Sequence, residues 1–200
     1  MKNISLIIII LLRVTIVLSQ KPISQHQLEV NYFGETYTHA GTSILYNYII
    51  HQKEKSKITK KGKVKTHFIQ YRSANRIAFY VHPQNHNGWL VTSALNVQRS
   101  KKNGWFVGTG LQAGYQLKFL NEDTYQINNG SVERIRWISQ SAFVTGFGVQ
   151  LGKDFSFKNP QNRFGWQINS SILWSSPFQI TSQLINFIEL GLSYDLSPKR

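Results

Sequence analysis

The chain has 200 residues, enough for one domain, and its pairing of many aromatic residues (13%) with few charged residues (16%) excludes a disordered chain. It contains no cysteine, which excludes a disulfide framework and thiolate metal sites. Its formal net charge is +14, and the excess is concentrated in the run Lys53–Lys65, which could attract nucleic acid, anionic lipid or another polyanion.

The first twenty residues have the layout of a secretory signal peptide. Lys2 gives a basic start, an apolar run follows from Ile4 to Leu12, and cleavage is expected before Gln20. An arginine soon interrupts the apolar stretch, which argues against a membrane-spanning helix because such a helix needs about 20 apolar residues. We therefore expect a signal peptide over 1–19 and one domain over 20–200, with an uncleaved anchor as the alternative.

From residue 27 onward, apolar and polar residues alternate with the period of a β-strand. In WFVGTGLQAGYQLKF (Trp105–Phe119) one face is bulky and apolar, whereas the other carries glycine, glutamine and one lysine. Seven such segments and a weaker first one predict eight strands, several of them longer than usual. The segments are Gln27–Glu35, Gly41–Gln52, Lys65–His82, Trp89–Arg99, Trp105–Phe119, Ile138–Lys153, Arg163–Trp174 and Leu184–Leu196.

The composition of the polar faces distinguishes a soluble barrel or sandwich from a membrane barrel. A face that meets water usually carries many charges, but these faces carry mainly Gly, Ser, Asn, Gln and Ala. Such residues suit the interior of a narrow barrel, and eight strands leave a lumen that side chains can fill. The bulky faces also end in aromatic residues, as the aromatic girdles of membrane barrels do. The predicted girdle residues are Trp89, Trp105, Phe119, Phe143, Trp166, Trp174 and Tyr194.

With these strands, rims and export signal, the chain resembles the small outer-membrane β-barrel proteins of Gram-negative bacteria, roughly over residues 27–196. It is also similar to a subfamily of these barrels with segments like FYVHPQNHNG and YFGE. The resemblance implies an all-β fold, an up-and-down antiparallel transmembrane β-barrel of about eight strands, and a place in the outer membrane. It implies outer-membrane lipid and the barrel assembly machinery as partners, but no activity. Many such barrels end on an aromatic residue, whereas this chain ends in DLSPKR, so a terminal signal would lie at Tyr194 or Leu196.

The alternation of side chains along the strands directs three basic and four acidic residues into the lumen. Buried charges must pair, so these residues predict an interior salt-bridge network that plugs the barrel, with an ion path as the alternative. Closure places the first and last strands side by side, which gathers the four acids on one wall. The predicted lumen charges are Glu29, Glu35, Arg72, Arg76, Lys118, Glu189 and Asp195.

The stretch HPQNHNG contains two histidines that could share a metal ion. No third ligand lies nearby in sequence, and the other residues are ordinary turn formers. We therefore expect a hairpin turn with His82, Pro83, His86 and Gly88, and no metal. No nucleophile, base and acid stand out together, so no catalytic residue and no cofactor is predicted.

The run Lys53–Lys65 holds seven lysines and one glutamate. We expect a solvated connection over 53–64 that could contact a polyanion, with nucleic acid not expected for an exported protein. With eight strands, the connections at 37–41, 83–88, 121–137 and 175–183 fall outside the cell. Those at 53–64, 100–104 and 154–162 then fall in the periplasm, and this orientation reverses if Gln27–Glu35 is not a strand.

For function, the first hypothesis is a non-enzymatic structural or adaptor component of the cell envelope with a side-chain-filled lumen. The alternatives are a lipid A-modifying or other envelope enzyme and a narrow pore.

Overall fold

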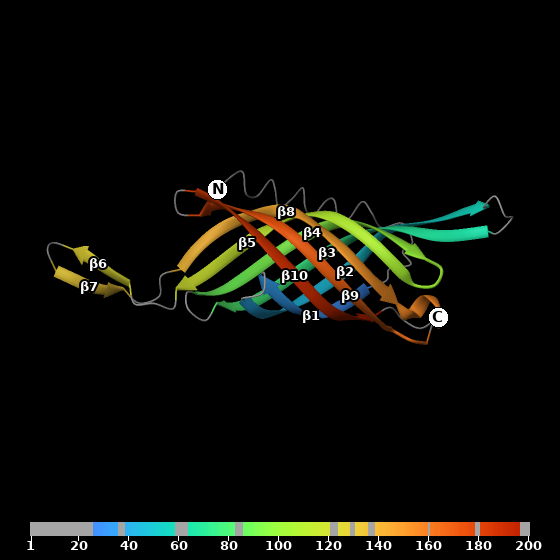
Figure 1. Ribbon diagram of the computed structural model, residues 1–200, viewed down its shortest axis with the longest axis horizontal. Helices are drawn as coiled ribbons and strands as arrows, with labels where there is room; N and C mark the ends of the chain where they lie inside the picture. The colour runs from blue at the N-terminus through green and yellow to red at the C-terminus, as the bar shows by residue number, and fades with distance from the viewer. Residues whose placement is uncertain are drawn as a thin grey trace.

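The computed structural model describes residues 26–35, 39–58, 64–82, 86–120, 124–128, 131–135, 139–159, 161–178 and 181–196. The expected signal peptide lies outside these residues. Within them, eight antiparallel strands close into a barrel in which each strand pairs with its neighbours along the chain (Figure 1). The barrel strands are β1 (His26–Glu35), β2 (His39–Ile58), β3 (Val64–His82), β4 (His86–Lys101), β5 (Trp105–Leu120), β8 (Ser139–Asp154), β9 (Phe164–Phe178) and β10 (Thr181–Asp195).

The barrel is closed by the pairing of β1 with β10, which runs in register from Gln27 opposite Asp195 to Glu35 opposite Phe187. The weakest predicted strand is therefore the one that completes the ring, and the up-and-down fold of eight strands is confirmed. Two short strands, β6 (Thr124–Asn128) and β7 (Ser131–Ile135), form a separate hairpin between β5 and β8.

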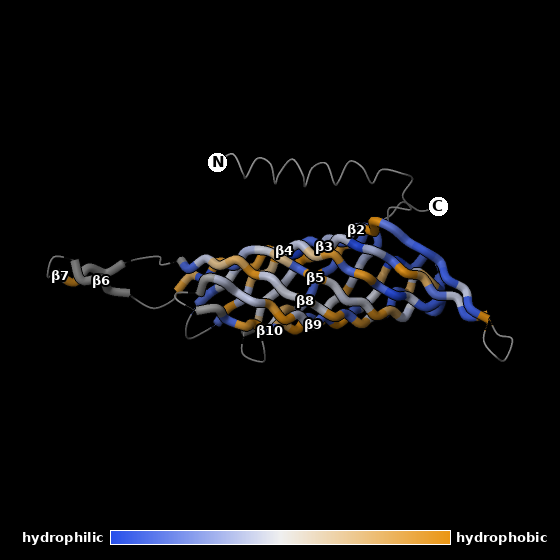
Figure 2. The backbone as a smooth tube through the Cα atoms, turned by 90° about the horizontal axis from the view of Figure 1, so that it is seen from above, coloured by the Kyte–Doolittle hydropathy of each residue, from blue (hydrophilic) through white to orange (hydrophobic). Residues whose placement is uncertain are grey.

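The two faces of the sheet are assigned as their composition predicts. On β5, the side chain of Leu111 is 74% exposed on the outside, whereas its neighbour Gln112 is 6% exposed in the lumen. The same alternation of apolar and polar residues runs along the other barrel strands (Figure 2). An apolar exterior around a polar interior is the arrangement of a transmembrane barrel, since lipid replaces water as the surrounding medium.

Glycine on the inner face allows strands and side chains to approach closely. At Gly110, an added Cβ would lie 2.5 Å from the backbone oxygen of Leu95 and 2.8 Å from Cα of Asn96. Such contacts are too short for any side chain, so the narrow lumen requires glycine at this position.

The connections divide between two ends of the barrel. β1 begins and β10 ends at the terminal end, where β2 also ends and β3 begins, β4 ends and β5 begins, and β8 ends and β9 begins. The opposite ends of these strands make the far end. The prediction of a solvated connection over 53–64 was wrong for most of its length. Lys53–Ile58 pairs with Val64–Ile69, and the part of this ribbon past the last β3–β4 pair, His67 with Lys101, projects beyond the barrel (Figure 1). Likewise, the connection 121–137 contains the β6–β7 hairpin.

A β-bulge at Ile50 sets the direction of the side chains on this ribbon. Ile49 pairs with Arg72, but His51 pairs with Tyr71, so Ile50 is the extra residue. The bulge exchanges the two faces of β2. As a result His51, which simple alternation assigns to the lumen face, is exposed on the outside.

We expect Leu111→Arg to destabilise the barrel by about 2–4 kcal/mol, because a cation near the middle of the lipid-facing surface must leave water. Urea unfolding of the protein in lipid vesicles measures this difference. Gln161→Arg, in the exposed segment between β8 and β9, is the matched control and should leave stability unchanged. A harmless Leu111→Arg would mean that the exterior does not contact lipid.

Candidate functional site: the lumen of the barrel

The middle of the lumen holds a buried ion pair. Nη2 of Arg76, on β3, lies 2.7 Å from Oε2 of Glu189, on β10. Nη1 of Arg76 donates to Oε1 of Gln112 (3.0 Å), and Oγ of Ser43 donates to Oε1 of Glu189 (2.7 Å). Because β3 and β10 are three places apart in the ring, the ion pair bridges the lumen.

A second polar layer surrounds Glu29 near the terminal end. Its side chain is 2% exposed and accepts hydrogen bonds from Nδ2 of Asn47 (2.5 Å) and from Nε2 of Gln167. These amides come from β2 and β9, on either side of β1 and β10, so the carboxylate is enclosed by the protein.

Arg72 belongs to the same layer. It donates from Nη2 to Oε1 of Gln70 (2.8 Å) and from Nη1 to Oε1 of Gln27 (3.1 Å). Its charge is attracted by those of Glu29, Asp154 and Asp195, which come from β1, β8 and β10. Further amides extend the layer: Nε2 of Gln98 donates to Oε1 of Gln70 (3.3 Å), and Nε2 of Gln150 donates to Oε1 of Gln98 (3.2 Å).

The far end of the lumen is filled by an apolar plug. The rings of Phe33 and Phe187 lie 4.5 Å apart, and Tyr80 lies about 6 Å from each of them. Nε2 of Gln116 donates to the hydroxyl of Tyr80 (2.6 Å), which satisfies its polar end. Each side chain of the plug is at most 1% exposed; its members are Phe33, Ala78, Tyr80, Leu90, Val144, Leu173, Ile185 and Phe187.

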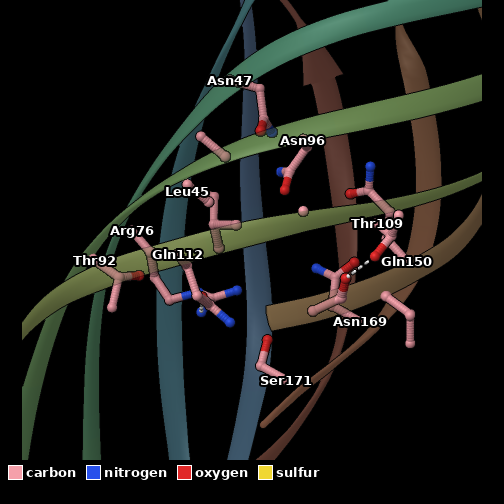
Figure 3. Close-up of a pocket in the computed structure, with 15 residues that line it drawn as sticks. Leu45, Asn47, Arg76, Thr92, Asn96, Thr109, Gln112, Gln150, Asn169 and Ser171 are labelled. Atoms are coloured by element: carbon pink, nitrogen blue, oxygen red, sulfur yellow. Dashed lines mark hydrogen bonds between the residues drawn. The ribbon is translucent and has the colours of Figure 1, made fainter. Parts of the chain in front are cut away.

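Between the polar layers lies a cavity of about 30 Å³ (Figure 3). The side chains of Arg76, Gln112, Asn47 and Asn169 point toward it from different strands (Figure 3). Small-molecule sites usually measure about 300–1,000 Å³, so this space is too small for a ligand of ordinary size.

The pairing of β1 with β10 places the acids Glu29, Glu189 and Asp195 on one wall, as predicted, and the lumen charges lie at different depths along the barrel. Arg76 and Glu189 form the middle pair, whereas Arg72, Glu29 and Asp195 lie nearer the terminal end. Lys118 is buried at the far end, where its Nζ donates to Oε1 of Gln183 (3.2 Å). The side chain of Glu35 lies outside the described part of the chain.

Sequence reasoning missed two features of the lumen. Asp154 was assigned to a connection, although its even number on β8 matches the inward set of Gly148, Gln150 and Gly152. The plug was missed because inward positions were expected to be small or polar. Parity alone would have placed Tyr80 and Leu90 inside, since they alternate with outward Phe79 and Trp89.

The predicted hairpin turn is shorter than expected. His82 ends β3 and His86 begins β4, where the two residues pair and their rings lie 5.4 Å apart. Gly88 also lies within β4, under the ring of Tyr80, while Pro83 lies outside the described residues. In the described ranges, no group of three or more His, Cys, Asp or Glu side chains could hold a metal ion.

The predicted girdle residues form two rims on the outside of the barrel. Trp105 and Trp166 lie at the terminal end with their rings 5.5 Å apart and nearly perpendicular, and Tyr194 packs on Phe164 at the same end. The remaining four lie at the far end on β4, β5, β8 and β9, and are Trp89, Phe119, Phe143 and Trp174.

Known proteins show only a distant likeness to this chain. No protein-family model matches the chain, and no curated sequence is significantly similar to it. Among solved structures, the N-terminal β-barrel domain of Pseudomonas aeruginosa OprF shares 12% identity, with 86% of this chain and 98% of that chain covered and a TM-score of 0.41. The β-domain of the Bordetella autotransporter BrkA shares 8% identity over the same fractions, with a TM-score of 0.30. The assignment of the fold therefore rests on the strand pairing itself.

Across the described residues, no helix has the length and apolar character needed to cross a membrane.

We expect Arg76→Ala to lower the stability of the barrel by about 3–5 kcal/mol, because it leaves the carboxylate of Glu189 buried without its cation. Adding Glu189→Gln should restore part of this loss, since the amide oxygen still accepts from Ser43. Urea unfolding of the two variants in vesicles measures the difference. If the double variant is no more stable than Arg76→Ala alone, the pair is not the source of the stability.

Proposed function

We propose that the chain is an integral outer-membrane β-barrel protein with a lumen filled by its own side chains, serving as a structural or adaptor component of the cell envelope. The observation that carries this proposal is the filling of the lumen by two polar layers and an apolar plug.

The exterior supports a membrane location. Side chains such as Leu111, Leu192 and Leu95 are exposed by 65% or more around the barrel, which would be unfavourable in water but not in lipid. The signal peptide predicted over 1–19 and the even number of barrel strands would both agree with the outer membrane of a Gram-negative bacterium.

The lumen favours a structural role over transport or catalysis. The carboxylates of Glu29 and Glu189 are held by amides, a hydroxyl and a guanidinium, so neither is presented to a substrate. The plug adds a dry layer that ions do not cross readily. Both ends of the barrel carry projecting hairpins, β2–β3 at one end and β6–β7 at the other (Figure 1), and these supply protein surface for an adaptor.

Membrane fractionation should recover the mature chain with the outer membrane. The folded barrel should also migrate differently on gels when samples are left unboiled, because a closed barrel resists detergent. In the variant Leu111→Arg, which should insert poorly, a smaller fraction of the unboiled protein should run in the band of the folded barrel. Recovery of the wild type as a soluble periplasmic protein would contradict the proposal.

The wild-type protein should show negligible ion conductance in planar bilayers, since both the ion pair and the plug cross the lumen. A variant with Phe33→Ala and Phe187→Ala in the plug, combined with Arg76→Ser and Glu189→Ser in the middle layer, should conduct measurably. Steady and reproducible single-channel currents from purified wild type would favour the pore instead.

A further inference from the structure

The surface charge of the barrel is strongly uneven. Among the described side chains, three Lys and Arg residues face the lumen: Arg72, Arg76 and Lys118. Apart from Arg134 on β7 in the far-end hairpin, the other described cations lie at the terminal end and outside the lumen. They are Lys53, Lys55, Lys57, Lys65, Arg99, Lys101, Lys102, Lys153, Lys158 and Arg163.

Four of these cations continue the lipid-facing surface and form what we call the basic band: Lys53, Arg99, Lys101 and Lys153. Arg99 pairs with outward-facing Val107 on β5 and Ile69 on β3, and Ile69 in turn pairs with Lys53. The bulge at Ile50 is what turns Lys53 outward, because without it the residue would belong to the opposite face.

Acidic side chains do not neutralise the band in the part of the chain that the structure describes. Asp154 and Asp195 lie at this end, but their charges interact with Arg72 in the lumen. Glu54 pairs with Phe68, so it occupies the ribbon face opposite to Lys53. These described acids therefore lie on other faces than the band, whose outer side carries four cations.

The aromatic rim fixes the depth of the band. Lys153 lies in register between Trp105 and Trp166, and its Nζ is 5.7 Å from the centre of the Trp105 ring. Interfacial tryptophans lie at the level of the lipid headgroups, and lysine and arginine side chains beside them extend their charge into that layer. Lys153 is thus at headgroup depth, and Arg99 lies near the same level because it pairs with Val107, two residues from Trp105 on β5.

We propose that the basic band binds the phosphate groups of anionic phospholipids in the leaflet at the terminal end. This inference rests on the proposed membrane location. In the orientation with both chain ends in the periplasm, that leaflet is the periplasmic one. The band would select anionic over zwitterionic neighbours by about fivefold for each cation close to the headgroups.

The ribbon lysines offer a soluble polyanion a different place to bind. Lys55, Lys57 and Lys65 share the outward face of the projecting ribbon, beyond the rim. Replacing these three lysines removes the same charge as replacing three cations of the band. The two sites can therefore be compared with variants of equal net charge.

The chain's tryptophans report on each leaflet separately. Trp89→Phe, Trp137→Phe and Trp174→Phe together leave Trp105 and Trp166 as reporters of the terminal end. Trp105→Phe, Trp137→Phe and Trp166→Phe together leave Trp89 and Trp174 as reporters of the far end. Each protein is reconstituted into phosphatidylcholine vesicles that contain brominated phosphatidylglycerol or, at the same fraction, brominated phosphatidylcholine.

The terminal-end reporters should be quenched more strongly by brominated phosphatidylglycerol than by brominated phosphatidylcholine, and the far-end reporters should show no preference. Arg99→Gln, Lys101→Gln and Lys153→Gln together should lower the preference at the terminal end by about tenfold or more. Lys55→Gln, Lys57→Gln and Lys65→Gln together, which remove the same charge, should leave the preference unchanged.

Equal preference at both ends, or equal loss in the two triple variants, would overturn the inference while leaving the membrane barrel intact. Loss only in the ribbon variant would assign the anion site to the ribbon instead. Absence of quenching by either brominated lipid would show that the protein does not insert, which contradicts the proposed function as well.

Discussion

The closure of β1 onto β10 is the constraint on which the rest of the structure depends. In a bilayer no water satisfies an open strand edge, so every strand needs a neighbour on both sides. Eight strands meet this requirement and leave a narrow lumen. The width of the lumen limits which side chains fit inside it. Glycine appears where strands approach closely, as at Gly110, and long polar side chains remain only where a partner reaches them from another strand, as Gln112 does with Arg76.

The same closure explains why charge is separated between the inside and the outside. Most described acids lie in the lumen, where they face Arg72 and Arg76, while most described cations lie outside at the terminal end. At the far end the lumen is filled mainly by the apolar plug, and the one buried cation described there, Lys118, donates to Gln183. The barrel therefore combines a dry layer with hydrogen-bonded layers, and both kinds occupy the space that a channel or a catalytic site would need.

Alternation along single strands was enough to predict the fold and the direction of most side chains. Trp105–Phe119 forms β5 with both faces as expected, and the weak Gln27–Glu35 segment forms β1. The bulge at Ile50 could not be predicted, because Ile50 and His51 fit either face and the choice depends on pairing with β3. The groups of lumen charges also depend on register between strands distant in sequence, as Arg76 and Glu189 show. The position of Tyr80 could have been predicted, because alternation along its strand directs it into the lumen. It was missed because only small or polar side chains were expected there.

The central claim, a lumen closed by side chains inside a lipid-facing exterior, is tested most directly by thiol reactivity. The chain has no cysteine, so single replacements at Leu111, Gln112 and Asn103 start from a clean background. A charged methanethiosulfonate reagent is applied to both sides of vesicles that contain each variant. The account predicts rapid reaction of Asn103→Cys alone, with Gln112→Cys protected by the packed lumen and Leu111→Cys by lipid. Reaction of Gln112→Cys at the rate of Asn103→Cys would reveal a water-filled lumen and contradict the account, as would reaction of Leu111→Cys.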